Sequence, residues 1–96
     1  MNIKEISIKI HENAVNKGFW DTKREFGTLI ALIHSELSEA LEGDRKEDYV
    51  NVGEELADVF IRLCDVCVGY GYDLEKEVLS KMEKNKNRPK MHGKKY

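Results

Sequence analysis

The sequence predicts an all-α fold, with one domain of four helices and no strand. Apolar residues recur three and four positions apart along most of the chain, which is the period of one helix face. Asp and Gly residues separate these periodic segments, as expected for helix caps and short links. A chain of 96 residues is long enough for one domain only. We assign that domain to residues 1–88 and a basic C-terminal tail to residues 89–96.

The first two helices are predicted from their apolar residues and their ends. The first begins at Ile3 and ends near Gly18, and its apolar stripe consists of Ile3, Ile6, Ile10 and Ala14. Asp21 is a suitable N-cap for the second helix. This helix then continues to Gly43, a residue type that commonly ends helices.

The third and fourth helices are predicted from similar capping signals. The sequence Asp44-Arg45-Lys46-Glu47 resembles a capping box and predicts a helix that continues to about Gly69. Asp73, followed by Glu75 and Glu77, predicts the start of a fourth helix. That helix runs to about Asn87, and Pro89 marks its end.

Two acidic pairs with the same spacing are the strongest functional signal in the chain: Glu36 with Glu39, and Glu55 with Asp58. Residues three apart lie on nearly the same side of a helix. Each pair also lies at one edge of the apolar face of its helix. These faces consist of Leu29, Ile33, Leu37, Ala40 and Leu41 in the second helix, and of Val52, Leu56, Val59, Phe60, Leu63 and Val66 in the third. Antiparallel packing of the two faces would therefore bring four carboxylates together.

Four unpaired carboxylates repel one another and lose hydration, so the acidic pairs predict a bound cation. Ligation by oxygen atoms alone favours Mg²⁺, with Mn²⁺ as the alternative. Such an ion typically binds substrate phosphates and can activate a water molecule. For either pair taken alone, an ordinary solvated helix face is the competing explanation.

The third helix has a second apolar stripe, formed by Val50, Ala57, Ile61, Cys64 and Val68. A helix with two apolar sides is buried on both, and four short helices do not easily provide that cover. The sequence therefore predicts a homo-oligomer, either a dimer or a tetramer. We interpret Cys64 and Cys67 as packing residues, because a single Cys-x-x-Cys inside a helix suits neither a zinc site nor a redox pair.

Charge is distributed unevenly along the chain. Residues 81–96 carry seven basic residues and one acid, whereas residues 1–80 carry nine basic and seventeen acidic residues. An acidic body argues against nucleic acid as a partner.

Phosphate contacts are predicted on the last helix, where Lys81, Lys84, Asn85 and Arg88 lie close to one face. A solvated basic face is the alternative. Arg62 is a further candidate phosphate contact, with a salt bridge to Asp58 or Asp65 as the alternative.

These motifs resemble the MazG-type all-α nucleoside triphosphate pyrophosphohydrolases, whose signature is E-x-x-E, a spacer and E-x-x-D. The resemblance covers nearly the whole chain and includes Lys81 and Asn85. It implies a four-helix MazG-like bundle completed by oligomerisation. It also implies Mg²⁺-dependent cleavage of the α-β phosphate bond of nucleoside triphosphates to monophosphate and pyrophosphate, in nucleotide-pool housekeeping.

The resemblance also implies roles for individual residues. Glu36, Glu39, Glu55 and Asp58 would be metal ligands, and Glu39 would in addition orient or deprotonate the attacking water. The residues that would bind the nucleotide are His11, Trp20, Arg62, Lys81, Asn85 and Arg88. A packing role for Trp20 is the alternative. Arg62 stands where some relatives have an aromatic residue, so the preferred base and sugar do not follow from the motifs.

Three other functions compete with this hypothesis. Phosphoribosyl-ATP pyrophosphohydrolase has similar metal chemistry in the same fold superfamily. A non-catalytic helical binding module would use the same bundle to bind a partner protein. Nucleic-acid binding through residues 81–96 ranks last. The chain has no signal-peptide core and no apolar run long enough to span a membrane, so we expect a cytoplasmic protein without membrane association.

Overall fold

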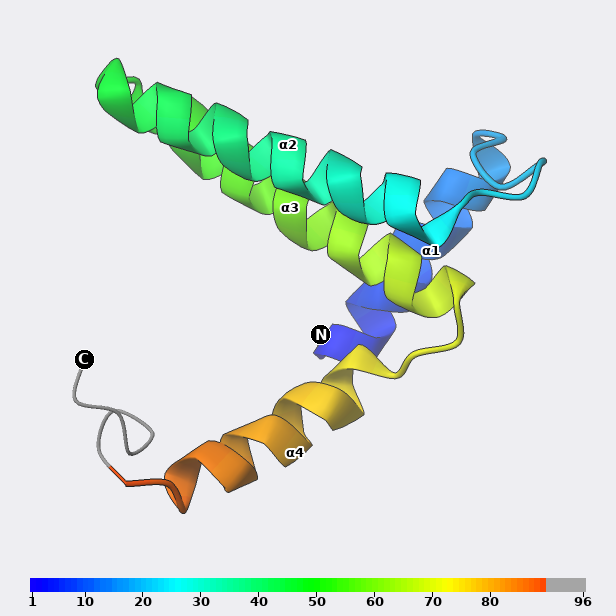
Figure 1. Cartoon of the computed structure of the whole chain (residues 1–96). Coiled ribbons are helices and arrows are strands. Elements are labelled where there is room, and N and C mark those ends of the chain that lie inside the picture. The colour runs from blue at the N-terminus through cyan, green and yellow to red at the C-terminus, as the bar shows by residue number, and fades with distance from the viewer. Residues whose placement is uncertain (90–96) are drawn as a thin grey trace.

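The structure is a computed structural model that describes residues 1–89, and all its regular elements within that range are helices. These are α1 (Ile3–Asn16), α2 (Phe26–Arg45), α3 (Tyr49–Gly69) and α4 (Leu74–Lys86) (Figure 1). The prediction of four helices and no strand is therefore confirmed for this part of the chain. Apart from Pro89, the predicted basic tail lies outside the described residues.

Helices α2 and α3 form an antiparallel hairpin, and α1 packs across the C-terminal half of α3 (Figure 1). The centre of the hydrophobic core consists of Leu29, Ile33 and Val66, with Trp20 and Leu63 packed against it. Cys64 is fully buried and Cys67 nearly so, and both are free thiols. Burial raises the pKa of the Cys67 thiol, which suits the packing role that we predicted for these two residues.

The predicted N-terminus of α2 is wrong by four residues, because the predicted N-cap was Asp21. The helix begins at Phe26, and its N-cap, Glu25, makes no capping hydrogen bond with its side chain. The segment before it is held in turns by tertiary contacts instead. The indole N–H of Trp20 donates a hydrogen bond to Asp65 on α3. The Tyr70 hydroxyl, just after α3, donates a hydrogen bond to the carbonyl of Arg24.

The predicted link between α2 and α3 also differs from the structure. Helix α2 continues two residues past Gly43, to Arg45. Gly43 is buried against Val52 of α3, and a β-carbon at this position would lie 3.0 Å from Cγ2 of Val52. The turn then uses Glu47 with a positive φ of 59°. Asp48, rather than Asp44, caps α3 by accepting a hydrogen bond from the backbone N–H of Asn51.

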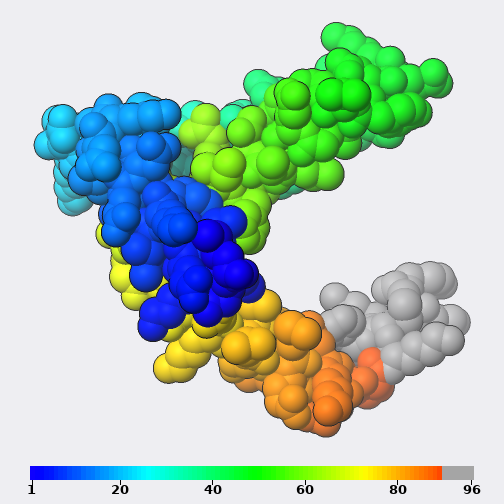
Figure 2. Space-filling model, turned by 180° about the vertical axis from the view of Figure 1, so that it is seen from behind, coloured from blue at the N-terminus to red at the C-terminus, as the bar shows by residue number. Residues whose placement is uncertain are grey.

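The fourth helix makes the molecule open rather than compact. Its cap was predicted correctly, since the Asp73 side chain accepts a hydrogen bond from the backbone N–H of Lys76. From there α4 runs away from the hairpin and leaves a wide notch (Figures 1 and 2). The radius of gyration is 15.9 Å, whereas a compact domain of this length has about 13 Å.

Part of each predicted apolar face remains exposed in the single chain. The exposed residues of the hairpin are Leu37, Leu41, Leu56 and Phe60 on one side, and Val50, Ala57 and Ile61 on the back of α3. Oligomerisation therefore stays a prediction. No helix within residues 1–89 is both long enough and apolar enough to cross a membrane.

Candidate metal site and adjoining pocket

The middle of the α2–α3 hairpin brings three of the four predicted metal ligands together. Carboxylate oxygens of Glu36, Glu39 and Glu55 lie within 4.8 Å of one another. Glu36 and Glu39 extend from one side of α2, and Glu55 reaches them from the facing side of α3. The matched positions of the acidic pairs beside their apolar faces predict this meeting, because the packing of those faces sets the rotation of both helices.

Glu55 has the most strongly perturbed ionisation in this cluster. A hydrogen bond with Glu36, which requires a proton on Glu55, is the main cause that raises the pKa of Glu55 to about 7. A similar bond with Glu39, loss of hydration and the charges of both neighbours act in the same direction. The same shared hydrogen bond, helped by Arg62, lowers the pKa of Glu36.

One oxygen of Glu55 supports the fit of this site to a cation. Its Oε2 atom is inaccessible to solvent and has no hydrogen-bond donor among the described residues. An ionised carboxylate in that position needs a positive partner, either a shared proton or a metal ion. The oxygen-only donor set suits Mg²⁺ or Mn²⁺. The three glutamates are therefore the residues that would hold such an ion.

Arg62 lies beside the cluster and pairs with Glu36. Its Nε donates a hydrogen bond of 2.9 Å to Oε1 of Glu36, and about two fifths of its side chain is exposed. The salt bridge that we considered for Arg62 was to Asp58 or Asp65 on its own helix, and this choice of partner was wrong. The acid that Arg62 reaches is on α2, because the inward side of α3 faces that helix.

Asp58 lies outside the group of three glutamates. It lies one helical turn after Glu55 and lines a pocket of about 470 Å³ between α1 and α3. The other residues that line this pocket are Ile10, Asn13, Ala14, Phe19, Arg24, Ile61, Arg62 and Asp65. Arg62 is thus shared by the acidic cluster and the pocket, so the two are adjacent. The role of Asp58 as a metal ligand stays a prediction.

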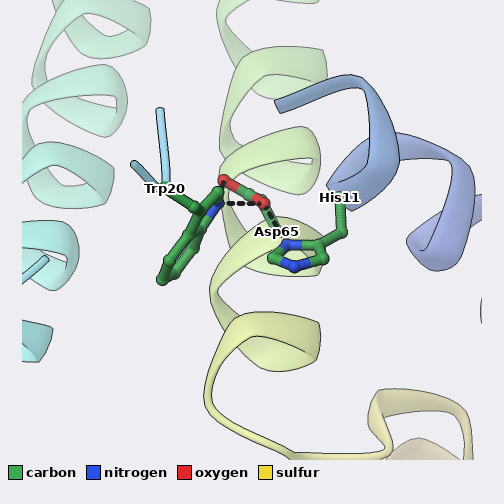
Figure 3. A network of polar contacts seen from close by, with 3 residues as sticks. All are labelled: His11, Trp20 and Asp65. Carbon is green, nitrogen blue, oxygen red and sulfur yellow. Dashed lines mark hydrogen bonds and ion pairs between the residues drawn. The ribbon is translucent and has the colours of Figure 1, made fainter. Parts of the chain in front are cut away.

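His11 and Trp20 meet at a buried acid on α3 (Figure 3). Oδ1 of Asp65 lies 2.7 Å from Nδ1 of His11, and the Trp20 Nε1–H donates hydrogen bonds of 2.9 and 3.1 Å to the two Asp65 oxygens. Trp20 also packs so closely on Gly69 that a β-carbon there would lie 2.3 Å from the indole ring. These contacts favour the packing role for Trp20, while direct contact of either residue with a base stays a prediction.

The predicted phosphate-binding residues of the last helix lie apart from the acids within one chain. The second half of α4, which carries Lys81 and Asn85, extends away from the hairpin, and Arg88 follows the end of that helix (Figure 1). Both Lys81 and Asn85 are exposed. The structure of a single chain therefore separates the basic and acidic halves of the predicted site.

Three residues near the pocket were not singled out from the sequence as site residues. Asp65 could have been, because it lies two helical turns after Asp58 among apolar neighbours, and a buried acid needs a partner. Arg24, whose guanidinium lies 5.6 Å from the centre of the Trp20 ring, and Asn13 carry no comparable signal. Their positions depend on how residues 17–25 fold.

Comparisons with protein-family models, with curated proteins and with solved structures each found no match.

Proposed function

We propose that the protein is a Mg²⁺-dependent nucleoside triphosphate pyrophosphohydrolase that cleaves the α-β phosphate bond and serves nucleotide-pool housekeeping. The observation that carries this proposal is the cluster of Glu36, Glu39 and Glu55, whose carboxylates lie within 4.8 Å of one another. One inaccessible oxygen of this cluster lacks a donor. Such a group is well suited to a hard cation that also binds phosphates.

Each acidic residue has a distinct task under this proposal. The three glutamates hold the ion, with Asp58 one turn further along α3 as the fourth acid. The bound ion supplies positive charge that neutralises the phosphate oxygens and favours attack by water. Glu39 is exposed, whereas Glu36 and Glu55 are half-buried. Glu39 is therefore best placed to accept a proton from a water molecule that arrives from solvent.

The adjoining pocket is a suitable place for the nucleoside part of the substrate. Its volume of about 470 Å³ is within the range of small-molecule sites. Phe19 offers an aromatic surface, and Asn13 offers both donors and an acceptor. Arg62, at the boundary with the acidic cluster, can exchange its bond with Glu36 for one with a phosphate. His11 and Trp20 support this pocket by fixing Asp65.

Product analysis tests the proposal directly. The full chain is incubated with a panel of ribo- and deoxyribonucleoside triphosphates, with Mg²⁺ and with EDTA. Monophosphate and pyrophosphate should appear only with the metal ion. Glu39→Gln should abolish this turnover, whereas Glu42→Gln is the matched control, because Glu42 is exposed on the same helix and pairs with Arg45 and Lys46 outside the cluster.

The other outcomes select the competing functions. Release of diphosphate and orthophosphate would reject the α-β bond as the site of cleavage. Turnover of phosphoribosyl-ATP alone would assign the same metal chemistry to that substrate. If neither kind of substrate is hydrolysed, the exposed apolar faces of the hairpin would favour the non-catalytic helical binding module.

A further inference from the structure

A second pocket, which we call the joint pocket, lies where the start of α1 meets the start of α4 (Figure 2). Its volume is about 210 Å³. The residues that line it come from α1, from the end of α3 and from the link into α4: Lys4, Ser7, Ile8, Val68, Gly71, Tyr72, Asp73 and Leu74. It shares no residue with the acidic cluster or with the larger pocket between α1 and α3. The joint pocket is therefore a separate cavity.

A buried hydroxyl at this pocket has no partner. Ser7 is only 5% exposed, and its Oγ atom is inaccessible to solvent and has no hydrogen-bond partner within residues 1–89. Burial of a hydroxyl without a partner destabilises a fold, so a hydroxyl in this position needs an explanation. The Ser7 side chain can rotate about χ1 between staggered positions. Because Ser7 lines the pocket, such a rotation can direct its hydroxyl to a ligand there.

Two opposite charges line the same pocket without pairing. Lys4 and Asp73 are both exposed, and neither forms an ion pair within residues 1–89. Asp73 caps α4 through Oδ1, so its second oxygen remains for a ligand. An ammonium group only donates hydrogen bonds and an ionised carboxylate only accepts them. A ligand that carries both a carboxylate and an ammonium group therefore matches this pair of side chains.

The rest of the pocket is mostly aliphatic, and the pocket is small. Ile8, Val68 and Leu74 form an aliphatic wall. Gly71 leaves open space, since a β-carbon there would meet no atom within 4 Å. An apolar cavity of about 150 Å³ holds one benzene molecule, so 210 Å³ suits an apolar group of that size with a few polar atoms. The pocket is smaller than the usual sites of drug-sized ligands, which argues against a nucleotide.

We propose that the joint pocket binds a free amino acid with an apolar side chain, such as leucine. The carboxylate of the amino acid pairs with Lys4 and accepts a hydrogen bond from Ser7, and its ammonium group pairs with Asp73. Its side chain lies against the aliphatic wall. A peptide terminus does not match, because it carries only one of the two charges. The inference is independent of the proposed function, because the joint pocket contains none of the residues assigned to the metal ion or the nucleotide.

A ligand in this position joins α1 to the start of α4. Without it, the polar contact between these helices is long, since the Lys4 N–H lies 3.5 Å from Oε1 of Glu75. Pairing of one ligand with both Lys4 and Asp73 adds a bridge between the two elements. The melting temperature should therefore rise with the concentration of the amino acid.

Titration of the full chain with L-leucine tests the site directly. Backbone amide chemical shifts of residues 4–8 and 71–74 should change in a saturable manner, whereas those of Glu36 and Glu39 should not. Glycine carries both charges but no side chain, so its Kd should be at least about 10-fold higher. Absence of saturable binding of leucine, or shift changes confined to the larger pocket, would overturn the proposal.

Analogues that lack one charge test the two ion pairs separately. Isopentylamine is leucine without its carboxylate, and isocaproate is leucine without its ammonium group. Each should bind the wild-type protein at least about 10-fold more weakly than leucine. Lys4→Gln should bind leucine and isopentylamine with similar affinity, and Asp73→Asn should bind leucine and isocaproate with similar affinity. Asparagine keeps the cap of α4, because it is as good an N-cap as aspartate.

Matched controls exist for both charge variants. Lys9→Gln removes another exposed lysine of α1, and Asp48→Asn changes the cap of α3 in the same way. Both controls should keep the wild-type preference for leucine over the two analogues. If Lys4→Gln and Asp73→Asn also kept that preference, the assignment of the two charges to one ligand would be overturned.

Ser7→Ala tests the buried hydroxyl. Without ligand, the melting temperature of this variant should rise, because a buried hydroxyl without a partner is removed. The affinity for leucine should fall by about 10-fold, because the carboxylate loses a hydrogen bond. An unchanged affinity, or a lower melting temperature from loss of a bond to the carbonyl one turn earlier in α1, would overturn the assignment of this hydroxyl to the ligand.

Discussion

Replacement of Asp65 by alanine should destabilise the protein strongly. Its carboxylate receives hydrogen bonds from Trp20 and contacts His11 at 2.7 Å, so it joins α1, the following turns and α3. The Asp65 side chain is only 11% exposed and that of His11 21%. A hydrogen bond to a charged acceptor contributes about 1.5–3 kcal/mol. For two donors, Asp65→Ala should therefore cost about 3–6 kcal/mol.

Urea unfolding followed by circular dichroism at a fixed protein concentration measures this cost. Asp65→Asn should cost less, about 1 kcal/mol, because Oδ1 remains as an acceptor and lies within reach of both donors. Glu54→Ala, at an exposed position of the same helix, is the control and should stay within about 0.5 kcal/mol of wild type. If Asp65→Ala also stayed within that range, the reasoning that Asp65 holds the N-terminal segment in place would be refuted.

Three further predictions concern the packing of α3, the acidic pairs and pH. Gly69→Ala should destabilise the fold by about 1–3 kcal/mol in thermal unfolding, because its β-carbon would overlap Trp20; an unchanged melting temperature would contradict this packing. Asp58→Asn should abolish Mg²⁺-dependent turnover while the far-UV circular dichroism stays the same, and retained activity would remove this acid from the site. Without divalent ions, stability should fall as pH rises from about 4.5, the ordinary pKa of Glu55, to about 7, its raised pKa in the folded chain. Over that range the unfolded chain loses a proton that the folded chain keeps, so Glu55→Gln should flatten the curve.

Helix ends fixed by local residues were predictable from the sequence, whereas those fixed by tertiary contacts were not. Asp73 and Gly69 were placed correctly, because the cap is formed by residues next to it in the chain. Asp21 was not a cap, because the docking of Trp20 on Asp65 holds the segment around it in turns. Asp44 was also not a cap, because α2 continues past it to Arg45 while Gly43 packs against α3.

The candidate site was predictable to a similar degree. The meeting of Glu36, Glu39 and Glu55 was predictable from the sequence. The side of a helix on which a residue lies depends only on its spacing from the apolar residues of that helix. The salt-bridge partner of Arg62 was not predictable, since the rotation of α3 against α2 selects it. The separation of α4 from the acids was not predictable either, because helical spacing does not specify the direction that a chain takes after a turn.

The attachment of residues 1–25 to α3 at Asp65 also bears on the order in which the chain folds. Residues 26–69 meet across one short turn, whereas His11 reaches Asp65 across 54 positions of sequence. Contacts between near neighbours close smaller loops and form faster. We therefore expect the hairpin to form first and residues 1–25 to join it late. On that expectation, Asp65→Ala should mainly accelerate unfolding and leave the folding rate nearly unchanged in stopped-flow measurements. An equally slowed folding rate would place this attachment in the folding nucleus instead.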